Sequence, residues 1–295
     1  MKRTLFSLIA IVAPLHAAPL DPAQLPSSAK WYLHADIEAM RASDTGKAVF
    51  SHIEAEHGAQ ILAAKRMFSL NPMTDLSGVT LFGDGKKDRA VALIHGNFNR
   101  AHLEEIVAGA EGYSKESHAG TTVHHWQDKG KEQNAAFASD TLLVFSGQPA
   151  LLHEALDTLK AKPAEAAPAT PQGAGNTLVQ AHANLSQIEL PGDEARLLRL
   201  AETLNLGASE NAGRFSFHLA AKTADGTRAD QLRRICDGVF AFVEACDPKL
   251  HGLDLQGSVA VIPEPSGISA TVSLPVVEWL QVLQKAGEEA KKLKK

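Results

Sequence analysis

Residues 253–274 decide the fold most clearly, and they read LDLQGSVAVIPEPSGISATVSL. On both sides of the proline- and glycine-rich turn at 263–267, apolar and polar residues alternate, as they do in strands with one buried face. Two such strands joined by a short turn form an antiparallel hairpin, and antiparallel sheets commonly leave one face to water. This stretch therefore predicts a hairpin that covers a core on one side only.

The neighbouring residues extend this hairpin into a unit that runs from 214 to 293. A strand is expected at 214–221, an amphipathic helix at 227–246 and a closing helix opened by Pro275. The first helix has an apolar stripe with helical spacing, formed by Leu232, Ile235, Cys236, Val239, Phe242 and Val243. Helices over one face of an antiparallel sheet are typical of the α+β class.

The same order of elements recurs earlier in the chain. Strands are expected at 31–37, 79–82, 90–94, 121–126, 135–138, 142–145 and 178–185, and helices within 37–69, after Asn99, at 150–160 and at 194–204. Three matches keep their order: His34-Ala35-Asp36-Ile37 with His182-Ala183-Asn184-Leu185, Asn99-Arg100-Ala101 with Thr227-Arg228-Ala229, and Pro149 with Pro275. We predict two similar α+β halves, each a largely antiparallel sheet with helices packed on one face.

Composition divides the chain further. Lys2 and Arg3, an apolar run and small residues at 17 and 18 predict a signal peptide over 1–17, with an uncleaved membrane anchor as the alternative. A Pro/Ala-rich lead then covers 18–29 and an α+β domain 30–161. An Ala/Pro/Gly-rich linker covers 162–176, and a second α+β domain covers 177–295.

Charge and cysteine content limit the function. The net charge of −5 becomes −7 without Lys2 and Arg3, which argues against a nucleic-acid partner. After signal cleavage no stretch is long enough for a transmembrane span. On one helix, Cys236 and Cys246 would lie about 15 Å apart, too far for a disulfide. We expect buried thiols, unless the helix breaks after Val243. The sequence leaves the oligomeric state open.

Histidines supply the candidate sites. The first set lies on the polar faces of expected strands and is a candidate for binding: His34, Asp36, His182, Asn184 and His218. The second set, His118, His124 and His125, lies in one hairpin and is the candidate metal site. Against it, neighbouring strand residues point to opposite faces. No nucleophile stands beside these groups, so no catalytic residue is assigned, and no cofactor motif is present.

The opening strand, Lys30-Trp31-Tyr32-Leu33-His34-Ala35-Asp36, the signal peptide and the two halves together resemble exported bacterial envelope proteins of the domain-of-unknown-function type. The resemblance implies compartment and architecture only. We expect a periplasmic or extracellular, non-enzymatic protein without a cofactor, which acts through protein surfaces with envelope proteins as partners. The alternative is a metal-binding protein or a hydrolase that uses the histidines of the polar sheet faces.

Overall fold

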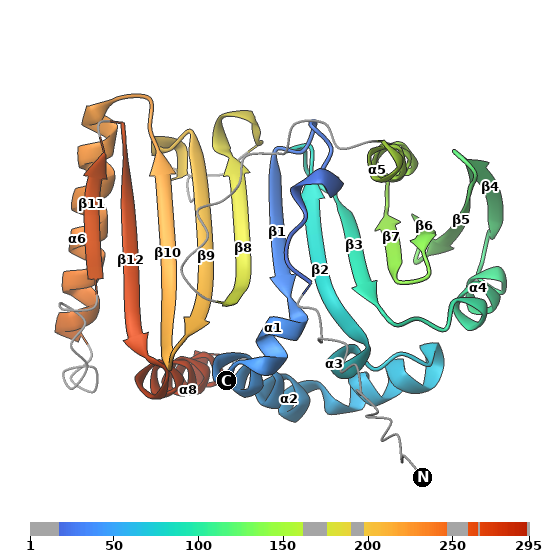
Figure 1. Cartoon of the computed structure of the whole chain (residues 1–295), viewed down its shortest axis with the longest axis horizontal. Coiled ribbons are helices and arrows are strands. Elements are labelled where there is room, and N and C mark those ends of the chain that lie inside the picture. Colours follow the sequence, from blue (N-terminus) through green and yellow to red (C-terminus); the bar gives the residue numbers. More distant parts are fainter. Residues whose placement is uncertain (1–17, 162–175, 190–197, 247–258, 265, 294–295) are drawn as a thin grey trace, which may run out of the picture.

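The protein is an α+β fold built on one large antiparallel sheet (Figure 1). The computed structural model describes residues 18–161, 176–189, 198–246, 259–264 and 266–293. The expected signal peptide, all of the linker except Asn176 and the start of the strand expected at 253–262 lie outside these residues. Within them, the sheet has 12 strands, in the order β11-β12-β10-β9-β8-β1-β2-β3-β7-β6-β5-β4.

The N-terminal half contributes the strands at one end of this sheet. They are β1 (Trp31–Asp36), β2 (Leu76–Gly83), β3 (Val91–Gly96), β4 (Ser114–His118), β5 (Thr121–Asp128), β6 (Lys131–Ser139) and β7 (Leu142–Ser146). Its helices are α1 (Ile37–Ala42), α2 (Asp44–Phe68), α3 (Pro72–Asp75), α4 (Arg100–Ala108) and α5 (Pro149–Lys160). A 3-10 turn, η1 (Pro22–Gln24), lies in the lead.

The C-terminal half continues the sheet on the other side of β1. Its strands are β8 (Asn176–Asn184), β9 (Thr203–Asn211), β10 (Arg214–Lys222), β11 (Val259–Glu264) and β12 (Gly267–Pro275). Its α-helices among the described residues are α6 (Gly226–Cys246) and α8 (Val276–Leu293). The alternation that predicted the hairpin at 253–274 is thus realised in the pair β11–β12.

The first five strands of each half follow the same order when they are read outward from the junction of the halves, and β5 and β4 extend the N-terminal half beyond them. The orders are β1-β2-β3-β7-β6 in one half and β8-β9-β10-β12-β11 in the other. Leu93 pairs with Val144 and Leu219 with Ala270, positions that differ by 126 residues, but Leu93 faces the core under α5 whereas Leu219 faces the core under α6. The shared strand order is what two similar halves would give, while the repeat itself and its origin by duplication stay predictions.

The helix starts correspond at different residues from those matched in the sequence. Asn99 caps α4 by accepting from the backbone N–H of His102, and Asp225 accepts in the same way from the N–H of Arg228. Asn99 therefore corresponds to Asp225, with the same shift of 126, rather than to Thr227. A helix start is marked by the residue whose side chain accepts a hydrogen bond from the backbone N–H three residues later. This criterion is a better guide than the sequence match.

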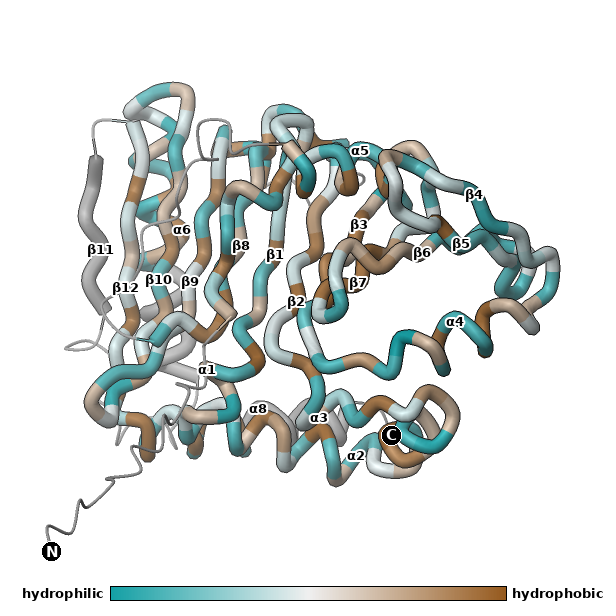
Figure 2. The backbone as a smooth tube through the Cα atoms, turned by 45° about the vertical axis from the view of Figure 1, so that its right-hand side comes forward, coloured by the Kyte–Doolittle hydropathy of each residue, from teal (hydrophilic) through white to brown (hydrophobic). Residues whose placement is uncertain are grey.

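The sheet has cores on both of its faces. In the N-terminal half, α5 places Leu152 and Leu156 on Leu93 and Val144, all of them fully buried. In the C-terminal half, Leu232 and Cys236 of α6 pack against a core that contains Ile268. The N-terminal half also carries α4 on the face opposite α5, whereas one covered face was expected. Figure 2 shows hydrophobic residues along β3 and β7 and a hydrophilic β4.

Two elements differ from the expectation. The helix expected at 194–204 is wrong, because 198–200 form a single 3-10 turn and Thr203 begins strand β9. Strand β4 was missed because its sequence, SKESH, contains no apolar residue to mark a face. In α6, Cys236 is a free, half-buried thiol, and burial raises its pKa. The side chain of Cys246 lies outside the described residues.

Contacts besides the sheet join the two halves. Glu210 of β9 accepts from the backbone N–H groups of Asp44 and Thr45 at the start of α2. Helices α2 and α8 also contact each other below the strands (Figure 1). Among the described helices, none is long and apolar enough to cross a bilayer.

Candidate ligand pocket

Helix α4 forms one wall of the site. Asn99 caps its N-terminus, and Arg100 Nε bonds Glu104 Oε1 at 2.7 Å one turn later. The apolar residues Leu103, Ile106 and Val107 recur at helical spacing and line the space under the helix, yet each is only half-buried. A short amphipathic helix would ordinarily bury such a stripe completely. The space beneath α4 is therefore incompletely filled.

Strands β5, β6 and β7 form the floor. The two-residue period puts His124 and Trp126 on the same face of β5. The antiparallel pairing of β6 with β7 then places Ala135 beside Phe145 and Phe137 beside Leu143 on that face. Their neighbours Val123, Ala136 and Val144 point the other way, into the core under α5. The alternation along these strands thus places one set of side chains in the core under α5 and the other set in the floor of the pocket.

The end of α2 closes a third side. Phe68, its last residue, lines the pocket and is 36% exposed. His102 of α4 holds this end in place, because its Nε2 lies 2.9 Å from the carbonyl oxygen of Met67. The pocket is therefore assembled from α2, α4 and three strands, all within the N-terminal half.

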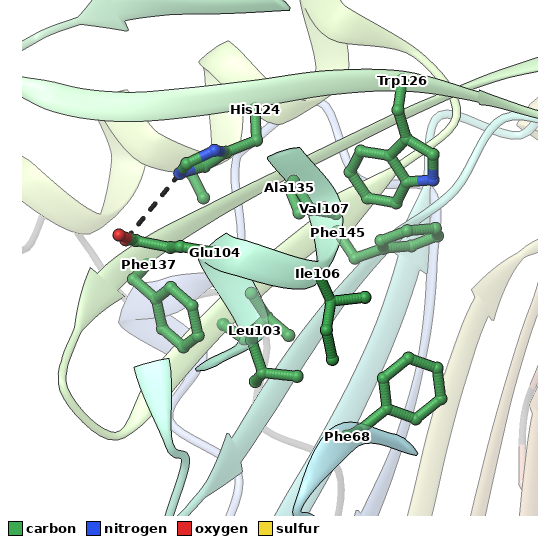
Figure 3. A pocket seen from close by; sticks show the side chains of 12 residues that line it. Phe68, Leu103, Glu104, Ile106, Val107, His124, Trp126, Ala135, Phe137 and Phe145 are labelled. Atoms are coloured by element: carbon green, nitrogen blue, oxygen red, sulfur yellow. Dashed lines mark ion pairs between the residues drawn. The ribbon is translucent and has the colours of Figure 1, made fainter. Parts of the chain in front are cut away.

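The resulting cavity has a volume of about 200 Å³ and a mostly apolar lining (Figure 3). The residues that line it are Phe68, Leu103, Glu104, Ile106, Val107, His124, Trp126, Ala135, Ala136, Phe137, Leu143 and Phe145. An apolar cavity of roughly 150 Å³ is known to stay dry and to admit benzene. The space under α4 therefore has room for one substituted aromatic ring or a short aliphatic chain.

Two polar side chains mark one end of the cavity. His124 is 7% exposed, and its Nδ1 lies 3.1 Å from the hydroxyl of Tyr113. Its Nε2 lies 3.8 Å from Glu104 Oε1 and has no hydrogen-bond partner. Burial lowers the pKa of His124 and outweighs the opposing effect of the Glu104 carboxylate. The imidazole is thus neutral at pH 7, with one ring nitrogen unsatisfied.

The structure divides the expected metal set. His124 faces the α4 pocket, whereas His118 and His125 lie on the side of α5. There His118 stacks on His153 at 4.1 Å and its Nε2 lies 2.8 Å from Asp157 Oδ1. Nε2 of His153 lies 2.8 Å from Glu116 Oε1, an ion-pair distance without hydrogen-bond alignment. Among the described residues, no three such groups are placed to hold a metal ion.

Two residues of the expected binding set are structural. His34 is 2% exposed, with Nδ1 at 2.8 Å from the Thr80 hydroxyl and Nε2 at 3.0 Å from the Ala18 carbonyl oxygen. Asp36 is buried and caps α1 through the backbone N–H of Ala39. Both of these side chains are thus satisfied within the protein.

The other three do not converge either. His182 Nδ1 lies 2.8 Å from Asn205 Oδ1, His218 Nδ1 lies 2.8 Å from the Thr271 hydroxyl, and Asn184 Oδ1 accepts from the hydroxyl of Ser186. His182 and His218 do share a sheet face, as the alternation predicted, but each bonds its neighbour on the adjacent strand. This row has the pattern of cross-strand pairs that stabilise a sheet.

Sequence reasoning selected His124 but missed the apolar residues that surround it. The signal that could have found them is the register of the hairpins from 121 to 145, since alternation gives His124, Trp126, Ala135 and Phe145 one face. The position of Phe68 depends on how α2 crosses the end of the sheet, which no local pattern indicates.

No protein-family model and no curated protein matches this chain. Among solved structures, it is similar to crystal form III of TP0453, with 10% identity and a TM-score of 0.47 over 91% of this chain and 99% of that one. Crystal form I of TP0453 gives 12% identity and a TM-score of 0.47, over 91% of this chain and 98% of that one.

Proposed function

We propose that this chain is a non-enzymatic binding protein of the cell envelope that holds a small, largely apolar ligand beneath α4. The observation that carries the proposal is the cavity of about 200 Å³, apolar except for His124 and Glu104 at one end. Concave, mainly apolar sites with a few convergent polar groups are the usual form of a small-molecule site. The proposal replaces the sequence-based expectation of a protein that acts through protein–protein surfaces with binding of a small molecule.

Export forms part of the proposal and has support in the residues that follow the expected signal peptide. From Ala18 onward the chain packs against the sheet: Ala18 receives the hydrogen bond from His34, and Leu25 joins the core under α5. A mature chain that begins near Ala18 would therefore keep these contacts. N-terminal sequencing of the native protein tests this part, and a retained Met1 would contradict it.

A cavity-filling variant tests the pocket. Toluene should bind the full chain with a Kd on the order of 0.1–1 mM, the range for a ligand with so few atoms. Ala135→Leu adds three carbon atoms in the floor of the cavity and should weaken binding at least tenfold. A saturation-transfer NMR titration measures both affinities.

Ala101→Leu is the matched control, because Ala101 lies on the exposed side of α4. This variant should bind toluene as the unchanged protein does. If toluene does not bind, or if both variants bind it equally well, the pocket is not the ligand site. If the pocket instead takes up an apolar side chain of a protein partner, toluene would still bind to it. A pull-down from envelope extract should then recover that partner.

A further inference from the structure

His124 has a buried ring nitrogen whose role the fold does not explain. Buried polar atoms nearly always have a hydrogen-bond partner, and an exception needs a reason. Here Nδ1 is satisfied by Tyr113, while Nε2 is unpartnered and lies at the wall of the cavity (Figure 3). The atom therefore lies at the wall of the cavity without a hydrogen-bond partner inside the protein.

Glu104 supplies a second polar atom beside the first. Its Oε1 is held at 2.7 Å by Arg100 Nε and lies 3.8 Å from His124 Nε2, too far for a direct hydrogen bond. A single oxygen placed about 2.8 Å from each atom would reach both. The two side chains thus offer a donor and an acceptor to one ligand oxygen at the end of an apolar cavity.

We infer that the ligand is a neutral alcohol or phenol with a compact apolar body, whose hydroxyl accepts from His124 Nε2–H and donates to Glu104 Oε1. This inference rests on the proposed function of the pocket and adds the chemical class of the ligand. The proposed bond requires the ring proton on Nε2, which is the tautomer in which the Tyr113 hydroxyl donates to Nδ1.

Charge argues against the other head groups. A carboxylate or phosphate would meet the Glu104 carboxylate and a neutral imidazole, since burial, helped by the charges of Arg100, Lys115 and His125, keeps the pKa of His124 low. An ammonium group would have only Glu104, whose charge Arg100 already balances. A hydroxyl is the head group that satisfies both side chains without adding charge to the cavity.

Three methyl-substituted rings of one size test the inference on the full chain. They are p-cresol, toluene and 4-methylbenzoate, each titrated by saturation-transfer NMR. We expect p-cresol to bind about tenfold more tightly than toluene, as two modest hydrogen bonds allow. 4-Methylbenzoate should bind more weakly than toluene. In His124→Leu, p-cresol and toluene should bind equally.

The outcomes separate this inference from the proposed function. If none of the rings binds, the pocket itself is refuted. Equal affinity for p-cresol and toluene in the unchanged protein would refute the hydroxyl recognition while leaving the pocket in place, and so would tightest binding of 4-methylbenzoate. A preference for p-cresol that survives in His124→Leu would remove His124 from the recognition. If His124→Leu does not fold, Glu104→Leu at the half-exposed end serves instead, and it too should lose the preference.

Discussion

At the scale of single residues, burial and hydrogen bonding decide what each histidine does. His34 and His124 are both buried on β-strands, but His34 has partners at both ring nitrogens and His124 at only one. The first is therefore part of the core, and the second is a candidate contact for a ligand. Their sequences do not distinguish them, because each lies in a short alternating stretch.

The buried histidines predict a loss of stability in mild acid. Burial lowers the pKa of His34, His95 and His124 below the ordinary value of 6.5. The unfolded chain therefore takes up protons first as the pH falls. The free energy of unfolding should therefore be highest above pH 6.5. Below pH 6.5 it should decrease by up to about 1.4 kcal/mol per pH unit for each proton that the unfolded chain binds in excess. Urea unfolding at pH 7.5 and 5.5 measures the decrease.

His34→Gln removes one of these groups while keeping an amide near the Ala18 carbonyl. The variant should be less stable at pH 7.5 but should lose less free energy between pH 7.5 and 5.5. His57→Gln, on the exposed side of α2, is the control and should keep the full decrease. An unchanged pH dependence in His34→Gln would mean that His34 is protonated as readily in the fold as in the unfolded chain.

At the scale of elements, the helix ends connect parts of the fold that are distant in sequence. Glu210 of β9 provides both carboxylate oxygens, each at 2.9 Å, to the N–H groups of Asp44 and Thr45. A carboxylate is favourable at the positive end of a helix dipole and satisfies N–H groups that have no partner within the helix. The first turn of α2 is thus anchored by the other half of the chain.

Glu210→Ala should therefore lower the free energy of unfolding by about 1–2 kcal/mol, the usual range for a lost helix cap. Glu132→Ala on β6, where the glutamate is exposed, should change it by no more than roughly 0.5 kcal/mol. Chemical denaturation of the two variants measures the difference. Equal effects would show that the carboxylate does not hold α2.

Elements with a clear period could be predicted from the sequence, and those without one could not. The helix at 227–246 and the strands at 31–37 and 142–145 were placed to within one or two residues, because each has an apolar face. β4 has no apolar face, and Leu197, Leu200 and Leu204 happen to have helical spacing across the start of β9. The α4 pocket was beyond prediction, since it depends on how far α4 stands from the sheet rather than on any motif.

At the scale of the whole molecule, β1 and β8 join the two halves. Their antiparallel register pairs Leu33 with Ala181, Trp31 with Ala183 and Ala35 with Val179. The segments expected as separate domains at 30–161 and 177–295 therefore contribute to one continuous sheet, while their ability to fold alone stays a prediction. The alternation of apolar and polar residues predicted most of the strands within each half. The pairing of β1 with β8 is a long-range contact, which local alternation cannot predict.

The two halves of the sheet carry different surfaces. Helix α6, with 21 residues, covers its face of the sheet more extensively than α4, with nine. The pocket thus lies where the corresponding helix is short. In the C-terminal half, the opposite face carries the hydrogen-bonded polar row with His182 and His218. Ligand binding is proposed at the first surface and not at the second.

Hydrogen–deuterium exchange of the full chain, with and without saturating p-cresol, tests this placement most directly. We predict slower exchange of the backbone amides in α4 and in β5, β6 and β7, because a ligand that fills the cavity stabilises the packing of α4 on the sheet. Exchange in β8, β9 and β10 should not change. Protection centred on those three strands, or no protection at α4 with the ligand bound, would contradict the account.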